Sequence, residues 1–255
     1  MIVKVRKGYE IEGYLLENLV GSGGFSSVYR ARSIYPIPKY ETIIAVKVLH
    51  PRRLERRQVK KFVQEARISM QLSHPNIIRV YQIVQQDKNM FILMEYLDFD
   101  LMTAIKTRKN LFNPDNVMKI IIKAGTGLAY VHSNGIIHKD VNPSNILISY
   151  SLATVKFTDF GLASQKRFFR REENIKAGTE GYVAPERLKG QPSDIRTDIY
   201  AFGKTIEKIY SELGFEFSED LIRIIRKATH PDKDERFARM EDLLNSLKGN
   251  LQNAY

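Results

Sequence analysis

The most constraining feature of the chain is a run of polar residues, His138–Asn145, followed by the triplet that begins at Asp159. Asp140, inside the run, can accept a proton from a hydroxyl group. Asn145 and Asp159 offer amide and carboxylate oxygens, which hard divalent cations prefer. Two short strands of a hairpin are predicted between these ligands, at Ile146–Ile148 and Thr154–Phe157. A hairpin would aim both ligands at one cation pocket, an arrangement suited to phosphoryl transfer.

These residues resemble the catalytic loop and the metal-binding loop of the protein kinase family. The resemblance implies that ATP is the phosphoryl donor, that Asp140 accepts the proton of the substrate hydroxyl, and that Asn145 and Asp159 hold Mg²⁺ or Mn²⁺. It also implies a bilobal α+β fold, with a small antiparallel β lobe carrying one main helix and a larger, mostly helical lobe. One departure is Asn142, where serine/threonine kinases usually carry a lysine near the γ-phosphate. Its carboxamide can bond a phosphate oxygen without adding charge, so slower transfer is expected.

A glycine-rich segment, Gly21–Val28, lies between runs that predict strands, Leu15–Val20 and Val28–Ala31. Glycines allow backbone N–H groups to close over phosphate oxygens. By the resemblance, the residues that cover the phosphates are Gly21, Ser22, Gly23, Gly24, Phe25 and Val28. Ser26 stands where the family has its third glycine, and a plain hairpin turn is the alternative interpretation.

A charged pair is predicted next. Ile44–Lys47 is typical of a buried strand, and the resemblance assigns Lys47 to the α- and β-phosphates with Glu65 as its ion partner. Glu65 lies in a predicted helix, Gln58–Leu72. Taken alone, Lys47 could be a surface residue, and Glu65 could pair with Lys61 one helical turn away. The order of the motifs along the chain favours the kinase interpretation.

The last strand of the first lobe is predicted at Phe91–Tyr96. The resemblance implies that the adenosine part of ATP is bound by backbone groups of Glu95 and Leu97, by the side chains of Val28, Ala45, Met94 and Leu147, and by the carboxylate of Asp100. For the apolar members of this set, plain core packing is the alternative.

The rest of the chain predicts helices, because apolar residues recur at helical spacing. The predicted helices are Asn116–Asn134, Asp198–Leu213, Glu219–Thr229 and Met240–Leu247. Between Leu213 and Glu219 there is little room for the helix and loops that the family normally places there. The docking surfaces of the family therefore cannot be carried over to this chain.

The segment Gly178–Glu186 matches the end of the kinase activation segment. By the resemblance, Arg236 pairs with Glu186 through two parallel hydrogen bonds, and Asp198 accepts hydrogen bonds from the catalytic-loop backbone. An ordinary surface contact is the alternative for the pair. Thr179 fits the pattern of serine/threonine kinases.

Two features bear on regulation. Lys139 replaces the arginine that usually reads an activation-segment phosphate, and residues 166–176 contain no Ser, Thr or Tyr. We therefore expect that phosphorylation in the middle of this segment does not switch the protein on. The remaining candidates there are Ser164 and Thr179.

The 255 residues suffice for a single catalytic domain over 1–255, with lobes at 1–96 and 97–255, and not for a second sizeable domain. The chain ends just after its last predicted helix, which also fits a domain cut from a longer protein. It has no cysteine, which excludes disulfides and thiolate chemistry. No apolar run could span a bilayer and no signal peptide is recognisable, so a cytoplasmic location is expected.

Part of the net charge of +11 comes from two runs of basic residues, Arg52–Lys61 and Lys166–Arg171. A solvated helix face explains the first. The second lies in the activation segment, where it would steer acidic protein substrates or an acidic partner. Nucleic-acid binding is not favoured, because only Phe168 and Phe169 could stack on bases. A serine/threonine protein kinase is thus predicted; the alternatives are a kinase-fold binding module with weak catalysis and a small-molecule phosphotransferase.

Overall fold

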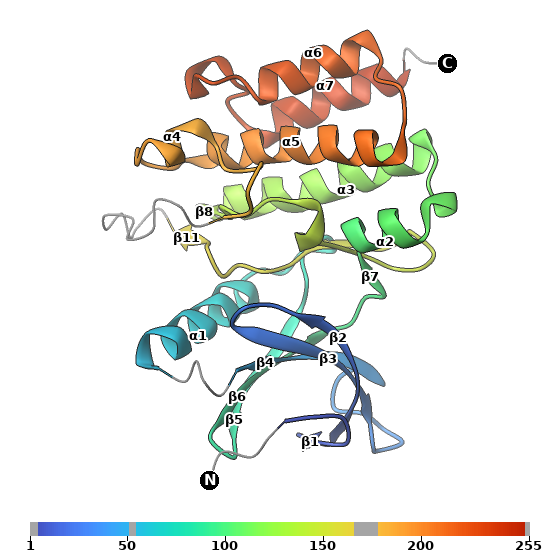
Figure 1. Ribbon diagram of the computed structural model, residues 1–255, viewed down its shortest axis with the longest axis vertical. Helices are drawn as coiled ribbons and strands as arrows, with labels where there is room; N and C mark the ends of the chain where they lie inside the picture. The colour runs from blue at the N-terminus through green and yellow to red at the C-terminus, as the bar shows by residue number, and fades with distance from the viewer. Residues whose placement is uncertain (1–4, 51–54, 166–177, 253–255) are drawn as a thin grey trace. The chain divides into compact units, whose positions relative to one another are not determined.

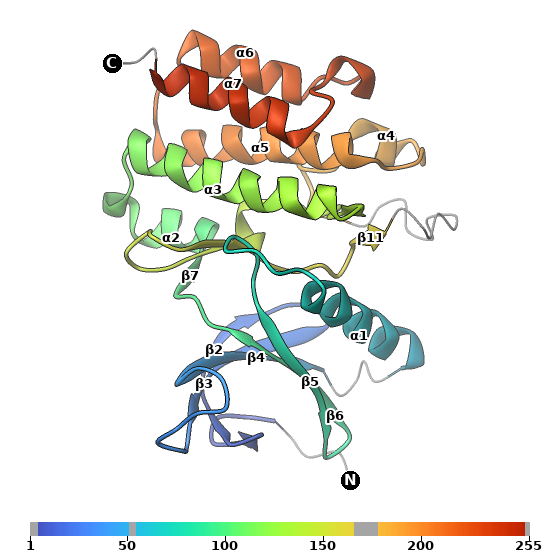
Figure 2. The same ribbon diagram turned by 180° about the vertical axis from the view of Figure 1, so that it is seen from behind.

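The computed structural model describes residues 5–50, 55–165 and 178–252, and these form two compact units (Figures 1 and 2). The first unit comprises the described part of Met1–Ser73 together with Ile78–Leu97. The second unit comprises His74–Ile77 together with the described part of Asp98–Tyr255. The main boundary lies one residue beyond the predicted one.

The segment His74–Ile77 belongs to the second unit because it pairs with that unit's hairpin. Ile77 bridges Phe157 in parallel, and Asn76 donates to the carbonyl of Val155 at 2.9 Å.

The first unit is an antiparallel sheet of six strands in the order β1-β2-β3-β4-β6-β5, with one helix among its described residues. Its elements are β1 (Glu10–Ile11), β2 (Tyr14–Ser22), β3 (Ser26–Ser33), β4 (Ile43–Leu49), α1 (Arg56–Met70), β5 (Val80–Gln86) and β6 (Asn89–Glu95). The predicted strands and helix of this lobe are therefore confirmed.

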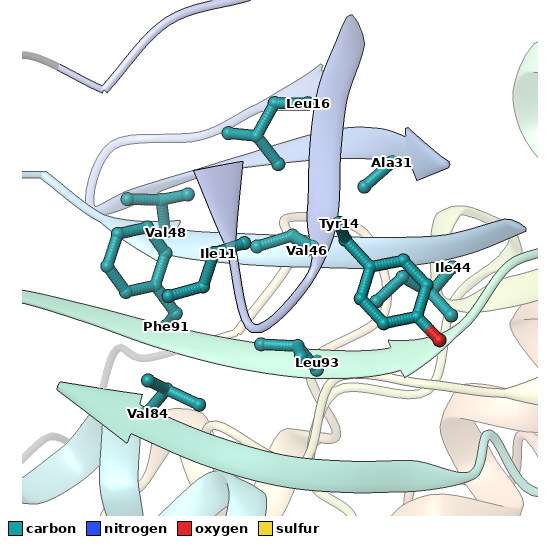
Figure 3. Close-up of a cluster of buried hydrophobic side chains, with 10 residues drawn as sticks. All are labelled: Ile11, Tyr14, Leu16, Ala31, Ile44, Val46, Val48, Val84, Phe91 and Leu93. Carbon is teal, nitrogen blue, oxygen red and sulfur yellow. The ribbon is translucent and has the colours of Figure 1, made fainter. Parts of the chain in front are cut away.

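Two apolar clusters lie on the two faces of this sheet, because successive side chains of a strand point to opposite faces. Figure 3 shows the first cluster, to which β6 contributes Phe91 and Leu93. The second cluster takes Met90 and Ile92 from the same strand and packs them against Phe62 and Ala66 of α1. In β4, residues 44, 46 and 48 belong to the first cluster. The alternation therefore places Lys47 on the α1 face.

The second unit consists mainly of helices, with short strands near the catalytic loop (Figures 1 and 2). Its longer helices are α2 (Leu101–Thr107), α3 (Pro114–Ser133), α5 (Ile195–Leu213), α6 (Glu219–Ala228) and α7 (Met240–Gln252). Its short elements are β7 (Phe99–Asp100), η2 (Lys109–Leu111), β8 (Ile136–Ile137), η3 (Pro143–Asn145), β9 (Ile146–Ile148), β10 (Val155–Phe157), β11 (Ser164–Gln165), α4 (Pro185–Leu188) and η5 (Lys233–Glu235). All four predicted helices are present, and α2 was not predicted. The connection 214–218 leads directly from α5 to α6.

The two long helices of this unit begin at capping boxes, in which the capping side chain and the third helical residue bond each other's backbone N–H groups. Asn113 and Asn116 do this for α3, and Asp194 and Thr197 do it for α5. Helix α5 ends at Gly214, whose φ of 73° suits glycine. Apolar residues of α3 pack against α7, and α5 packs against α6. Among the described residues, no helix is long and apolar enough to cross a bilayer.

Close backbone packing at α3 gives a testable stability prediction. A Cβ at Gly127 would lie 2.6 Å from the carbonyl oxygen of Asn76, and that oxygen is fixed because it accepts the N–H of Phe157 at 2.9 Å. We expect Gly127→Ala to lower the unfolding free energy by about 1 to 3 kcal/mol. In contrast, a Cβ at Gly249 in α7 meets no atom of the described residues within 4 Å, so Gly249→Ala should stabilise by up to about 1 kcal/mol. Urea unfolding of both variants tests this, and equal effects would refute it.

Candidate active site

The catalytic loop is anchored by a buried carboxylate, Asp198, in the first turn of α5. Its oxygens accept the backbone N–H groups of His138 and Lys139, both at 2.8 Å. One oxygen also lies 2.9 Å from Nε2 of His132. The prediction for Asp198 is therefore confirmed.

Electrostatics keep this anchor ionised. Burial alone would raise the pKa of Asp198, but its hydrogen bond with His132, the charges of His132 and His138, and the backbone bond of His138 outweigh burial and lower that pKa below its usual range. A carboxylate can therefore hold the loop without taking up a proton.

Asp140 is held at both carboxylate oxygens. Oδ1 accepts the backbone N–H of Thr179 at 3.0 Å and its hydroxyl at 2.9 Å. Oδ2 accepts Nδ2 of Asn145 at 3.0 Å. These donors fix the direction of the carboxylate, as a general base requires. The contact with Thr179 was not predicted, because it joins two segments distant in sequence.

The predicted hairpin brings Asn145 and Asp159 to the same end, as expected. Strands β9 and β10 pair Ile146 with Phe157, and Thr158 donates its N–H to the carbonyl of Asn145 at 3.0 Å. Asn145 is buried, and its Nδ2 also donates to the backbone carbonyl of Asp140 at 2.8 Å. Both bonds use the amide nitrogen, so neither engages the amide oxygen.

Asp159 adopts a left-handed backbone conformation, with φ of 61°. Its Oδ1 accepts the N–H of Gly161 at 3.1 Å. A non-glycine residue in this region carries conformational strain, which is common at functional sites.

The chemistry of this donor set fits Mg²⁺. Within the described ranges, no group of three or more His, Cys, Asp or Glu side chains could hold a metal by itself. Mg²⁺ is usually bound through one or two carboxylates and completes its shell with substrate phosphates and water. One carboxylate from Asp159 and one amide oxygen from Asn145 therefore suit a cation that arrives with a nucleotide.

Asn142 makes hydrogen bonds inside the catalytic loop that were not predicted. Its Nδ2 donates to the carbonyl of Asp140 at 3.1 Å and to the hydroxyl of Thr179 at 3.0 Å, while its Oδ1 accepts the N–H of Ser144 at 2.9 Å. Both N–H groups of the amide thus have acceptors inside the loop. These bonds tie Thr179 to the catalytic loop, and the contact of Asn142 with a phosphate oxygen stays a prediction.

In the first unit, the predicted ion pair is present. Nζ of Lys47 lies 2.5 Å from Oε1 of Glu65, and the two side chains are 12% and 13% exposed. The pair forms because β4 turns Lys47 toward the sheet face that carries α1. A largely buried, paired lysine is held in one direction, as phosphate binding would require.

The glycine-rich segment is the turn between β2 and β3. Gly21 pairs with Val28 and Ser22 with Ser27, and Gly23 donates to the carbonyl of Ser26 at 2.9 Å. Within the described part of the chain, a Cβ would meet no atom closer than 4.0 Å at Gly21 or Gly23, and none within 4 Å at Gly24. Internal packing therefore does not explain these glycines. A ligand that approaches the backbone would explain them.

The predicted adenosine-binding residues are distributed over both units. Ala45 and Met94 are buried and pair across β4 and β6, and Glu95 ends β6 just before Leu97. In the second unit, Leu147 pairs with Asp100.

The structure gives Asp100 a role that was not predicted. Its Oδ1 accepts the N–H of Thr103 at 2.9 Å and caps α2. Its predicted contact with ribose stays a prediction.

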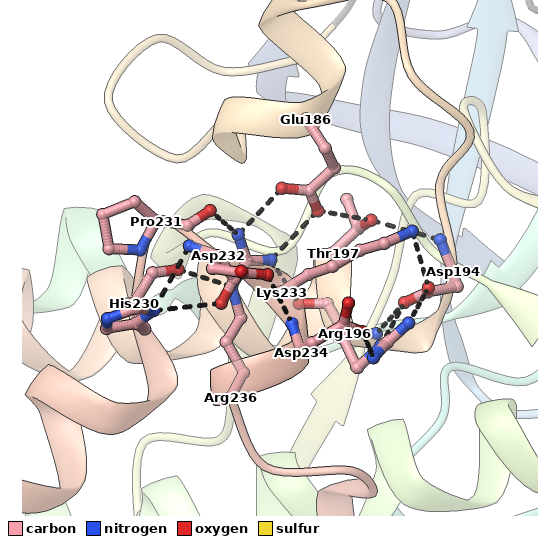
Figure 4. Close-up of polar contacts among 10 residues, drawn as sticks. All are labelled: Glu186, Asp194, Arg196, Thr197, His230, Pro231, Asp232, Lys233, Asp234 and Arg236. Carbon is pink, nitrogen blue, oxygen red and sulfur yellow. Dashed lines mark hydrogen bonds and ion pairs between the residues drawn. The ribbon is translucent and has the colours of Figure 1, made fainter.

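Figure 4 shows the buried ion pair predicted between Glu186 and Arg236. The guanidinium donates to both carboxylate oxygens, at 3.0 and 2.8 Å, and the two side chains are 4% or less exposed. Burial would raise the pKa of Glu186, but hydrogen bonds from Arg236, the backbone and Thr197, together with the charge of Arg236, lower it. The prediction is confirmed.

Comparison with known proteins agrees with this geometry. The model of a family described as protein kinase domain matches residues 14–247. A protein of Clostridium perfringens named as a probable serine/threonine-protein kinase is 36% identical over 192 residues, which cover 74% of this chain and 27% of the relative. The serine/threonine-protein kinase PrkC of Bacillus subtilis is 30% identical over 199 residues, covering 77% and 30%. The serine/threonine-protein kinase PLK4 of Xenopus tropicalis is 29% identical over 198 residues, covering 77% and 20%.

The chain thus spans between 20% and 30% of the length of these three relatives. The family match, by contrast, covers nearly the whole chain, from the first long strand to the last helix. The chain belongs to the protein kinase family.

Proposed function

We propose that this chain is an active serine/threonine protein kinase, which transfers the γ-phosphoryl group of ATP to hydroxyl groups of proteins. The observation that carries the proposal is the Asp140 carboxylate, aimed by Thr179 and Asn145 on a loop that Asp198 anchors. The names of the relatives support the same activity. No observation favours the binding module or the small-molecule phosphotransferase.

Each residue has a role that follows from its chemistry. Asp140 accepts the proton of the substrate hydroxyl as that oxygen bonds to the γ-phosphorus, while the bond from the γ-phosphorus to the bridging oxygen breaks and ADP leaves. Lys47, held by Glu65, places a positive charge against the α- and β-phosphates. Asp159 and Asn145 would hold Mg²⁺, which would supply positive charge to offset that of the phosphate oxygens. Most of the rate enhancement then comes from positioning and charge neutralisation.

The substrate class is part of the proposal. Thr179 beside Asp140 supports serine and threonine as acceptors. Acidic protein substrates are expected from the basic run Lys166–Arg171, which lies outside the described residues. The first basic run, Arg52–Lys61, is described only in part, and there Lys60 and Lys61 are exposed on α1. A cytoplasmic location stays a prediction from composition.

Transfer of radiolabel from γ-labelled ATP to a peptide panel tests the proposal. The panel pairs acidic, neutral and basic flanking residues with Ser, Thr or Tyr acceptors. We expect Mg²⁺-dependent labelling of Ser and Thr peptides, strongest for the acidic ones. If ATP and Mg²⁺ stabilise the protein but no peptide or protein is labelled, the binding module is correct instead.

The contacts of Thr179 predict how phosphorylation acts here. A phosphate on its hydroxyl would remove the donor to Asp140 and place about −1.5 to −2 charges beside that carboxylate. We therefore expect Thr179→Glu to lower kcat at least about 100-fold, while Thr179→Ser stays near wild type. Phosphatase treatment of the wild-type protein should leave its activity unchanged. A loss of activity on dephosphorylation, traced to Ser164 or Thr179, would contradict this.

A further inference from the structure

Lys139 precedes the proposed base in a strained backbone conformation. Its φ is 68°, in the left-handed region that lysine rarely adopts. Side chains with a Cβ are disfavoured there, so surrounding contacts must maintain it. Because Lys139 and Asp140 share a peptide group, relaxation at Lys139 would turn the Asp140 carboxylate away.

Two charged side chains hold Lys139 from opposite sides. Its N–H is bound by Asp198 at 2.8 Å, as described above. Its carbonyl oxygen accepts Nη1 of Arg187 at 2.6 Å. Arg187 lies in α4, directly after Glu186, and is only 4% exposed. A hydrogen bond from a charged donor in such a buried place is stronger than one in water.

The guanidinium of Arg187 also lies against the activation segment. A Cβ built on Gly178 would be 3.3 Å from Nη1 of Arg187 and 3.7 Å from the carbonyl oxygen of Lys139. The φ of Gly178 is 133°, which allows this close approach only for glycine. Arg187 therefore sits where the residue before Thr179 meets the residue before Asp140.

We propose that Arg187 is a positioning residue of the kinase reaction: it holds Lys139 in its left-handed conformation and so keeps Asp140 aimed at the acceptor hydroxyl. The inference rests on the proposed function. Residues 166–176 of the activation segment contain no hydroxyl side chain that could be phosphorylated. In this proposal, Arg187 supports the catalytic loop without a phosphate there.

The test is a kinetic double-mutant cycle in the full chain, with Arg187→Met, Lys139→Gly and the combination. Methionine keeps much of the length of arginine and removes the donors. Glycine adopts the left-handed conformation without strain. We expect Arg187→Met to lower kcat about tenfold or more with little change in the KM for ATP. In the Lys139→Gly background the same change should cost less than about threefold.

Two further variants separate positioning from general destabilisation. Arg187→Lys keeps a charged donor and should recover part of kcat. Arg223→Met is the matched control, since its side chain is 75% exposed on α6 and should not alter kcat. Assays are run below the unfolding temperature of every variant.

The outcomes are distinct. Equal losses from Arg187→Met in both backgrounds, or an unchanged kcat in that variant, would overturn the role of Arg187 while leaving the kinase assignment intact. If the wild-type protein labels no substrate at all, the proposed function itself fails. An effect that appears only in KM for ATP would also contradict positioning of Asp140.

Discussion

Asp159→Ala should reduce phosphoryl transfer by at least about 1,000-fold, because it removes the only carboxylate of the proposed cation site. Without that charge, the cation and the phosphates it binds lose their fixed position. The variant should also lose the extra thermal stabilisation that ATP with Mg²⁺ gives over ATP with EDTA. Radiolabel transfer and thermal shift together measure both effects.

A second variant distinguishes loss of the carboxylate charge from loss of the fold. Asp159 has a left-handed backbone, with φ of 61°, which alanine tolerates poorly. Asparagine tolerates this conformation better and carries no charge, so Asp159→Asn should show a similar loss of transfer with a normal fold. Asp220→Ala, in the first turn of α6 with a side chain that is 42% exposed, is the control and should keep wild-type turnover. Near-normal turnover in Asp159→Asn would refute the assigned role of the carboxylate.

Arg236→Met should lower the unfolding free energy by about 3 to 5 kcal/mol, the largest stability effect that we expect. The guanidinium is fully buried against Glu186 and also donates to the carbonyls of Arg196 and Pro231, at 3.0 and 3.2 Å. Its removal leaves a buried carboxylate with one side-chain donor among the described residues, Thr197. Urea unfolding with an unchanged slope would report a loss of stability rather than a change in the unfolded state.

The control for this variant is Arg239→Met. The side chain of Arg239 is 68% exposed and pairs with Asp242 on the surface, so its loss should cost less than about 1 kcal/mol. Similar costs for the two variants would contradict a structural role for the buried pair.

The same pair predicts a pH dependence. Because the folded protein lowers the pKa of Glu186, the pair stabilises the fold above the pKa of an unfolded glutamate. That contribution is lost as the pH falls through the lower, folded pKa. Asp194, whose pKa is lowered to about 2 by Arg196 and Lys233 in spite of burial, acts in the same direction. Stability should therefore fall below about pH 4.5, and less steeply in Arg236→Met.

Much of the architecture could be predicted from local pattern. The nearly continuous apolar runs of β4 and β6 fit strands that are buried on both faces, and the helical spacing of apolar residues in α3 fits a helix with one buried face. The predicted hairpin of β9 and β10 indicated that Asn145 and Asp159 lie at the same end of that hairpin. Resemblance to the kinase family supplied the long-range pairs of Glu186 with Arg236 and of Asp198 with the catalytic loop.

What the sequence did not reveal depends on contacts between distant segments. No local sequence pattern shows that the amide of Asn142 donates to the carbonyl of Asp140 and the hydroxyl of Thr179. The same holds for the hydrogen bond from Arg187 to the carbonyl of Lys139. Asp100 was expected to face a ligand, and its role as a cap became visible only once α2 was known. Polar side chains with several possible partners are settled by tertiary packing.

The most direct test of the account is single-turnover transfer from γ-labelled ATP to an acidic Ser or Thr peptide, by wild type and by Asp140→Asn. Asparagine keeps the size of the side chain and removes the proton acceptor. The account predicts Mg²⁺-dependent transfer by the wild-type protein, and a strongly reduced rate in the variant with nucleotide binding intact. Equal rates for the two proteins, or no transfer by a wild-type protein that binds ATP and Mg²⁺, would contradict it.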